Sequence, residues 1–308
     1  SATMMVETRN RARRFLGRVA ERRYREVVMV VAVTVAVAIV LGLFPGWERA
    51  TTGLRTDVTP AEFGLFFLVA AFAGAVKGLV GFGFVTIVTP VLALLIDPTV
   101  AVIVLSVPPW FLNAFQVGES RAGLAMIKRE WKLIGFTVVG SAIGVFALAE
   151  VVLDAGLLFL IGLLIWGYVG FQVVRNFVTV PTASHAGIRS VVGFVTGVVM
   201  AVTNVGIVFP IYVHLFERDT ERFVGLMGML FLFLLTERIL QMWLMGMMTT
   251  YLLWLGATIG VVTLVGLGIG SALRRLAVDE RRFNWLIVAV LFVIGLNIMR
   301  ETASSVFG

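Results

Sequence analysis

The chain has 308 residues with a formal net charge of +7, and 59% of its residues are hydrophobic. Soluble domains are roughly 45–50% apolar, so a mean hydropathy of +1.01 excludes an ordinary soluble domain and predicts one polytopic membrane domain. The basic residues gather at the ends of apolar stretches, which indicates contact with lipid headgroups rather than nucleic acid. Cysteine is absent, which excludes disulfides, cysteine metal sites and sulfur transfer through a protein thiol.

The N-terminal segment 1–26 is rich in arginine and precedes the apolar stretch 27–44. Basic flanks favour the cytoplasmic side, so we expect the N-terminus to lie in the cytoplasm, with the arginines against lipid headgroups. The stretch 27–44 is long and lacks a small-residue cleavage pattern. It is therefore predicted to be an extra, uncleaved N-terminal span rather than a signal peptide.

Eight further apolar stretches follow, and two of them are interrupted by helix-breaking residues. Stretch 62–96 is interrupted at 77–83 and then contains Pro90, whereas stretch 190–216 is interrupted at 203–206 and then contains Pro210. The uninterrupted stretches are 98–117, 132–150, 154–174, 223–247, 250–273 and 283–299.

Charges in the connecting loops predict the topology. Loop 118–131 is basic and is expected inside, whereas loop 45–61 is nearly balanced and suits the outside. An odd number of crossings must separate these loops, which holds if 62–96 dips in and returns as a re-entrant pair of half-helices. The alternative, with both broken stretches as tilted single spans, would place the basic loop 118–131 outside.

These assignments predict an all-α polytopic membrane protein with two inverted-topology repeats. Residues 62–174 would hold one re-entrant pair and three spans, and residues 190–299 would hold the same elements entered from the opposite face. Segment 175–189 would link them in the cytoplasm. Secondary transporters of the cytoplasmic membrane commonly have this plan.

The two breaks predict an anion site, because half-helices starting near Phe84 and Ile207 would direct their N-termini at the bilayer midplane. Lys77 indicates that the ligand is negatively charged. A lysine inside a span costs at least about 2.5–3.5 kcal/mol and therefore usually faces a cavity or a partner. The alternatives are kinks that ease helix packing and, for Lys77, an ion pair with Glu237 or snorkelling to the surface.

The residues predicted to bind substrate come from both halves. Glycines allow close approach to the backbone, hydroxyl and amide groups complete hydrogen bonds, and an arginine can bind an oxyanion through two hydrogen bonds. The set is Lys77, Gly78, Gly81, Phe82, Gly83, Thr86, Asn113, Gln116, Thr203, Asn204, Gly206 and Arg238.

A second set is predicted to couple or gate transport. Glu237 lies far from a span end and is a candidate proton-coupling group, with Gln241 on the same helix face. His214 is a candidate pH sensor or gate. The alternatives are that Glu237 and Arg238 form a structural pair between helices, that Asn113 and Gln116 only join helices, and that the histidine is simply packed.

The sequence lacks the motifs of a metalloprotease, a hydrolase elbow or a phosphate loop. We therefore predict no enzyme activity, no cofactor and no metal. The expected partners are a small anionic substrate, membrane lipids and a coupling ion such as the proton, but no nucleic acid. The sequence leaves open which anion is moved, in which direction, and whether the chain forms a homo-oligomer.

The run from Ala70 to Gly83, followed by Pro90 and Asp97-Pro98, resembles the sulfite exporter TauE/SafE-type family. The second half is similar over 193–212, although Phe209-Pro210 stands where members often have Gly-Pro. The resemblance implies transport of sulfite, an organosulfonate, thiosulfate or a related anion, with the anion-binding role assigned first to the Lys77 segment. A passive anion channel and a non-transporting membrane subunit remain the alternative functions.

Overall fold

The computed structural model describes residues 26–50, 59–120, 130–150, 186–203 and 220–276, together with Phe209 and single helical positions within 159–174 and 289–300. Every regular element in these ranges is an α-helix. In chain order they are Glu26–Gly42, α2 (Pro60–Val80), α3 (Phe84–Leu95), α4 (Pro98–Val104), α5 (Pro108–Glu119), α7 (Trp131–Glu150), α9 (Ala186–Thr203), α11 (Thr220–Leu244) and α12 (Thr250–Arg275).

Four segments are long and apolar enough to cross a membrane: Pro60–Val80, Pro98–Glu119, Phe223–Leu244 and Thr250–Arg274. Large hydrophobic side chains such as Leu68, Val139 and Val265 point outward and are more than half exposed, as expected for residues that face lipid. The prediction of an all-helical, multi-pass membrane protein is therefore confirmed for the described residues.

The interruption predicted at 77–83 is shorter in the structure and covers residues 81–83, because α2 continues through Lys77 to Val80. Gly81 ends α2 with a φ of 92°, and its N–H bonds to the carbonyl of Lys77 at 2.7 Å. Gly83 begins α3 with a φ of 99°. Both values fall in the left-handed region that glycine tolerates best. The two arms are unequal, because α2 has 21 residues and α3 has 12, so α2 is longer than the predicted half-helix.

A second sequence signal also has a local structural consequence. The chain turns at residues 105–107, between α4 and α5, and α5 starts at Pro108. Proline suits the first turn of a helix because its missing N–H would have no partner there. The apolar stretch 98–117 is thus bent at Pro108-Pro109 and is not one straight helix.

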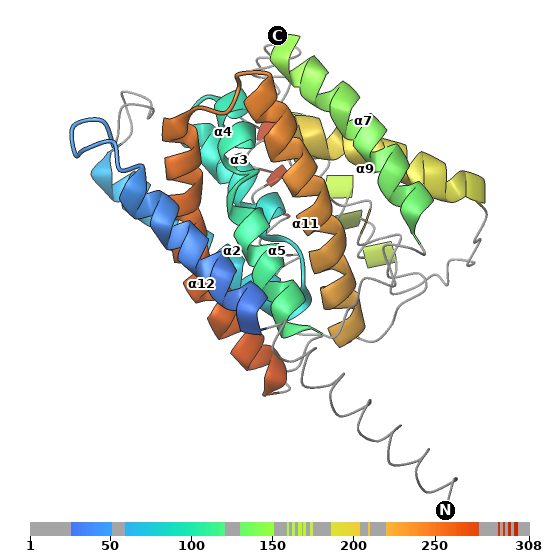
Figure 1. Cartoon of the computed structure of the whole chain (residues 1–308), viewed down its shortest axis with the longest axis horizontal. Helices are drawn as coiled ribbons and strands as arrows, with labels where there is room; N and C mark the ends of the chain where they lie inside the picture. The colour runs from blue at the N-terminus through green and yellow to red at the C-terminus, as the bar shows by residue number, and fades with distance from the viewer. Residues whose placement is uncertain are drawn as a thin grey trace, which may run out of the picture.

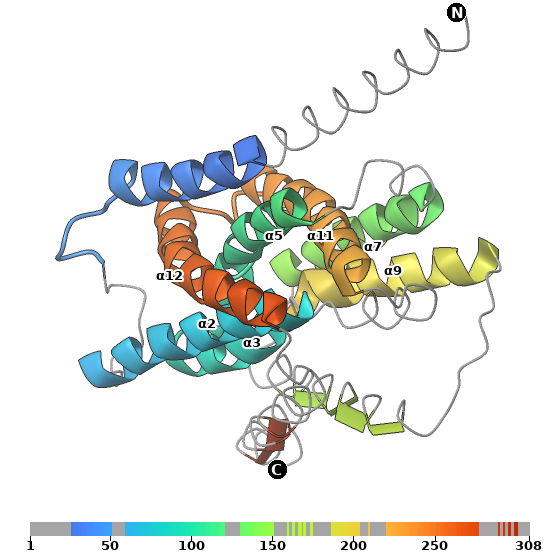
Figure 2. The same cartoon turned by 90° about the horizontal axis from the view of Figure 1, so that it is seen from below.

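Three helix pairs organise the molecule (Figure 1). Helix α2 packs along α12, and α7 packs along α9, while α5 and α11 contact each other between these two pairs. The view from below shows the same arrangement (Figure 2). Each outer pair joins one predicted repeat to the other, since α2 and α7 belong to 62–174 and α9 and α12 to 190–299.

Glycines allow the outer pairs to approach closely. A Cβ atom added to Gly78 or Gly270 would overlap a backbone carbonyl of the partner helix in the α2–α12 pair. The same holds for Gly140 and Gly197 in the α7–α9 pair. Such small-residue contacts are a common means of helix association in membranes, where lipid is as apolar as the helix surface.

The second break lies mostly outside the described residues. Helix α9 ends at Thr203, which agrees with an interruption that begins there. Asn204, Gly206, Pro210 and His214 fall outside the part of the chain that the structure describes.

Candidate functional site

Lys77 is buried beside the first break. Its side chain is 4% exposed, and its ammonium donates to Asn113 Oδ1 at 2.9 Å and to the Gly81 carbonyl at 3.2 Å. Both acceptors are neutral. Among the described residues no carboxylate forms an ion pair with Lys77, so neither the alternative pair with Glu237 nor snorkelling to the surface is observed.

Asn113 and Gln116 hold this lysine from the facing helix, α5. Gln116 is fully buried, and its Nε2 donates to the backbone carbonyl of Lys77 at 3.1 Å. Its Oε1 has no hydrogen-bond partner within the described part of the chain. The two amides thus bind the lysine at its ammonium and at its carbonyl, and they leave one buried acceptor unused.

The break itself supplies backbone groups next to the ammonium. Thr86 lies buried in the first turn of α3, whose amide groups have no side-chain cap. Phe82 stacks edge-on with Phe223 at 6.0 Å between ring centroids. Gly81 also needs its missing side chain, because a Cβ atom there would lie 2.7 Å from Val224 Cγ2.

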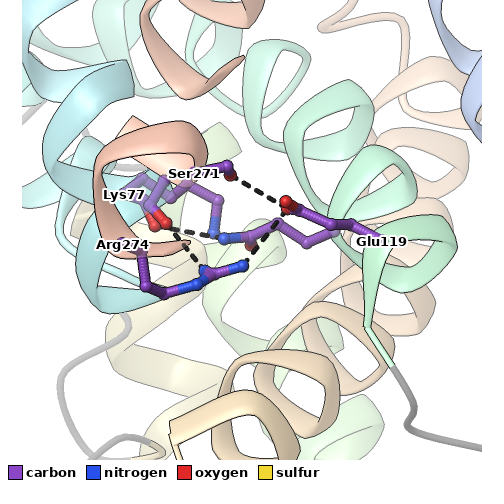
Figure 3. A network of polar contacts seen from close by, with 6 residues as sticks. Lys77, Glu119, Ser271 and Arg274 are labelled. Carbon is purple, nitrogen blue, oxygen red and sulfur yellow. Dashed lines mark hydrogen bonds and ion pairs between the residues drawn. The ribbon is translucent and has the colours of Figure 1, made fainter. Parts of the chain in front are cut away.

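The carbonyl of Gly78 accepts a hydrogen bond from Arg274 Nη1 of α12 at 2.7 Å. Arg274 also pairs with Glu119 of α5 at 3.4 Å, and Ser271 donates to the same carboxylate oxygen at 2.9 Å. Figure 3 shows Ser271 and Arg274 converging on Glu119 beside Lys77. We call Glu119, Ser271 and Arg274 the brace, because these residues tie the last turn of α2 to α5 and α12.

The predicted polar residues of the second half lie elsewhere. Arg238 is 1% exposed and donates to the carbonyl of Ala201 in the last turn of α9 at 2.7 Å. Glu237 and Gln241 are half-buried on α11. No hydrogen bond or ion pair joins these residues to Lys77 among the described contacts.

The structure therefore brings together five of the predicted binding residues: Lys77, Gly78, Gly81, Asn113 and Gln116. Thr86, Phe82 and Gly83 adjoin them along the chain. Arg238 lies instead at the end of α9, close to Thr203.

Sequence reasoning missed the brace. Glu119 and Arg274 lie at the ends of apolar stretches, where charged residues ordinarily face water or headgroups. Nothing in the local pattern shows that these two ends meet, because they are brought together only by the packing of α5 against α12. Both side chains are 3% exposed.

A comparison with protein families provides an independent finding. Residues 66–298 match the family described as Sulfite exporter TauE/SafE. The chain belongs to this family. The match begins inside α2 and includes the break at 81–83, both amides of α5 and the polar cluster of α11.

Membership of the TauE/SafE family makes the chain a multi-pass membrane protein of the anion-exporter type. No curated protein and no solved structure matches the chain. The TauE/SafE match thus supplies the class of function, while the roles of individual residues must be argued from their contacts.

Proposed function

We propose that the chain is a secondary transporter, and not an enzyme, that carries sulfite or a related sulfur oxyanion or sulfonate across the cytoplasmic membrane, with its N-terminus in the cytoplasm. The observation that supports this most is the buried ammonium of Lys77, whose hydrogen-bond acceptors among the described residues are both neutral. An unpaired buried charge is costly unless a counter-ion is available. A small anion at the break supplies that counter-ion.

The arrangement around Lys77 suits an oxyanion. The ammonium and the uncapped first turn of α3 both offer donors, and a helix N-terminus favours negative charge. Gln116 Oε1 is a buried acceptor without a partner among the described residues, which suits an anion that carries a hydroxyl or amino group as a donor. Lys77, Asn113 and Gln116 are all nearly inaccessible here, so we infer a closed conformation that must open to admit substrate.

We propose that two inverted repeats with re-entrant segments provide this opening by alternating access. The matched glycine contacts of α2 with α12 and of α7 with α9 support an internal two-fold relationship. Each tightly packed pair would move as a rigid arm against the central α5–α11 pair, which exposes the site to each side in turn. Coupling to protons and assembly as a homo-oligomer belong to the same proposal.

The first test is the binding of sulfite to purified protein carrying Lys77→Met, which removes the charge but keeps most of the side-chain volume. Removal of the ammonium should abolish the sulfite-dependent rise in thermal stability, because the counter-ion has lost its partner. Lys132→Met is the matched control, since Lys132 lies at the exposed start of α7, where its ammonium is 5.7 Å from the Trp131 ring. Equal sulfite stabilisation in the wild type and in Lys77→Met would refute the anion site.

The alternative functions are separated by flux in proteoliposomes. A carrier exchanges labelled sulfite against internal sulfite and saturates with concentration, whereas a passive channel shows neither property. A non-transporting subunit gives no flux with wild-type protein.

A further inference from the structure

The two glycine-packed helix pairs are equivalent residue by residue. A Cβ atom on Gly78 of α2 would lie 2.8 Å from the backbone nitrogen of Ser271 in α12. A Cβ atom on Gly197 of α9 would lie 2.6 Å from the backbone nitrogen of Ser141 in α7. Ser271 and Ser141 therefore occupy matching places in the two pairs.

Each of these serines lies beside a glutamate of the central helices. The Ser271 hydroxyl donates to Glu119 of α5. Ser141 of α7 lies next to Glu237 of α11, since these two helices contact each other. Each glycine-packed pair thus places a serine next to a carboxyl group of the central helices, at the end of α5 for Glu119 and inside α11 for Glu237.

The surroundings of the two carboxyl groups differ. Glu119 has a fixed cationic partner in Arg274 at 3.4 Å. Glu237 has no such partner, since both of its oxygens are inaccessible and neither has a hydrogen-bond partner in the part of the chain that the structure describes. The guanidinium of the neighbouring Arg238 donates to the Ala201 carbonyl and acts on Glu237 through space.

We propose that Glu237, with Ser141, binds the proton that is coupled to anion transport, while its counterpart Glu119 is fixed in the brace. Glu237 is half-buried, but both of its oxygens are shielded from water. A shielded carboxylate without hydrogen-bond donors is costly, and binding a proton removes its charge. Glu119 instead forms an ion pair with Arg274 and accepts a hydrogen bond from Ser271. The inference rests on the proposed transport function, and it assigns the coupling step to one carboxyl of the two.

Few other titratable groups face Glu237. Arg238 follows it on α11. Of the helices packed against α11, α5 carries Glu119, which Arg274 holds, and α7 carries Lys132 at its start and Glu150 at its end, away from Ser141. Helix α9, which accepts the Arg238 bond, carries Arg189 near its start. Glu221 lies in the first turn of α11, so Glu237 is the carboxyl group on these described helices that lies away from a helix end.

The test compares Glu237→Gln with Glu119→Gln in the full chain, reconstituted in liposomes. Three quantities are measured: sulfite binding, sulfite–sulfite exchange without a pH gradient, and sulfite accumulation driven by an imposed pH gradient. A pH-sensitive dye inside the liposomes reports proton movement during accumulation. Glu237→Gln should keep binding and exchange and lose both the gradient-driven accumulation and the dye response. Glu119→Gln should keep the dye response per sulfite moved, even where its thermal stability falls.

A milder matched pair covers the case in which either glutamine variant folds poorly. Ser141→Ala should shift the pH dependence of sulfite flux, whereas Ser271→Ala should leave it in place. Proton movement that persists in Glu237→Gln, or that is lost equally in Glu119→Gln, overturns the proposal. If the wild-type protein does not bind sulfite, the anion site at Lys77 is refuted instead. Failure of the proton-coupling proposal and failure of the anion site are therefore distinguishable.

Discussion

At the scale of single residues, the buried charged side chains have different kinds of partner. Lys77 is held by two neutral oxygens, Glu119 and Arg274 neutralise each other, and Arg238 is bound to a backbone carbonyl. A buried pair contributes little net stability, but removing one partner leaves an uncompensated charge. The brace is thus the place where a single substitution has the largest expected effect on stability.

We expect Arg274→Met to destabilise the protein by about 3–5 kcal/mol, because Glu119 is left charged and buried. The loss should appear as a lower thermal unfolding temperature in detergent. The double variant Arg274→Met with Glu119→Met should recover much of this loss, since no unpaired charge remains. Identical unfolding of the wild type and Arg274→Met would show that the pair has no structural role.

At the scale of helices, spacing and shape determine which faces meet. Glycines in α2, α7, α9 and α12 bring two helix pairs into backbone contact, and this contact places Ser271 and Ser141 beside the central helices. Glycines that meet nothing, such as Gly135 in α7 and Gly268 in α12, show that this role depends on the helix face and not on the residue type.

Two substitutions in α12 test this point. Gly270→Ala should lower the unfolding temperature and impair transport, because its Cβ atom would overlap the carbonyl of Ala75 in α2. Gly268→Ala is the control, since nothing lies within 4 Å of the added atom. It should be neutral or slightly stabilising, by at most about 1 kcal/mol, because alanine favours the helix. Equal effects of the two substitutions would contradict close packing of α2 on α12.

At the scale of the whole molecule, the proposed topology places the two halves in opposite orientations. The sequence makes this testable directly, because the absence of native cysteine allows single cysteines to be introduced without background labelling.

Ser184→Cys in the predicted cytoplasmic linker should react with a membrane-impermeant maleimide only after cells are opened. Thr249→Cys, in the turn before α12, should react in intact cells. Both variants should react fully in detergent, which controls for access. Labelling of both positions from the same side would exclude the proposed inverted arrangement.

The sequence by itself determined the membrane class, the all-helical fold, a helix interruption within 77–83 and the burial of Lys77, whereas the structure limited the interruption to residues 81–83. These features depend on composition and on local backbone preference, which neighbouring residues carry. Only the tertiary structure decided that Asn113 and Gln116 hold Lys77, that Arg274 pairs with Glu119, and that Ser141 lies next to Glu237. Those contacts join helices that are far apart in the chain, and their energies depend on which helix faces pack together. The local sequence pattern of a helix does not specify its partner face.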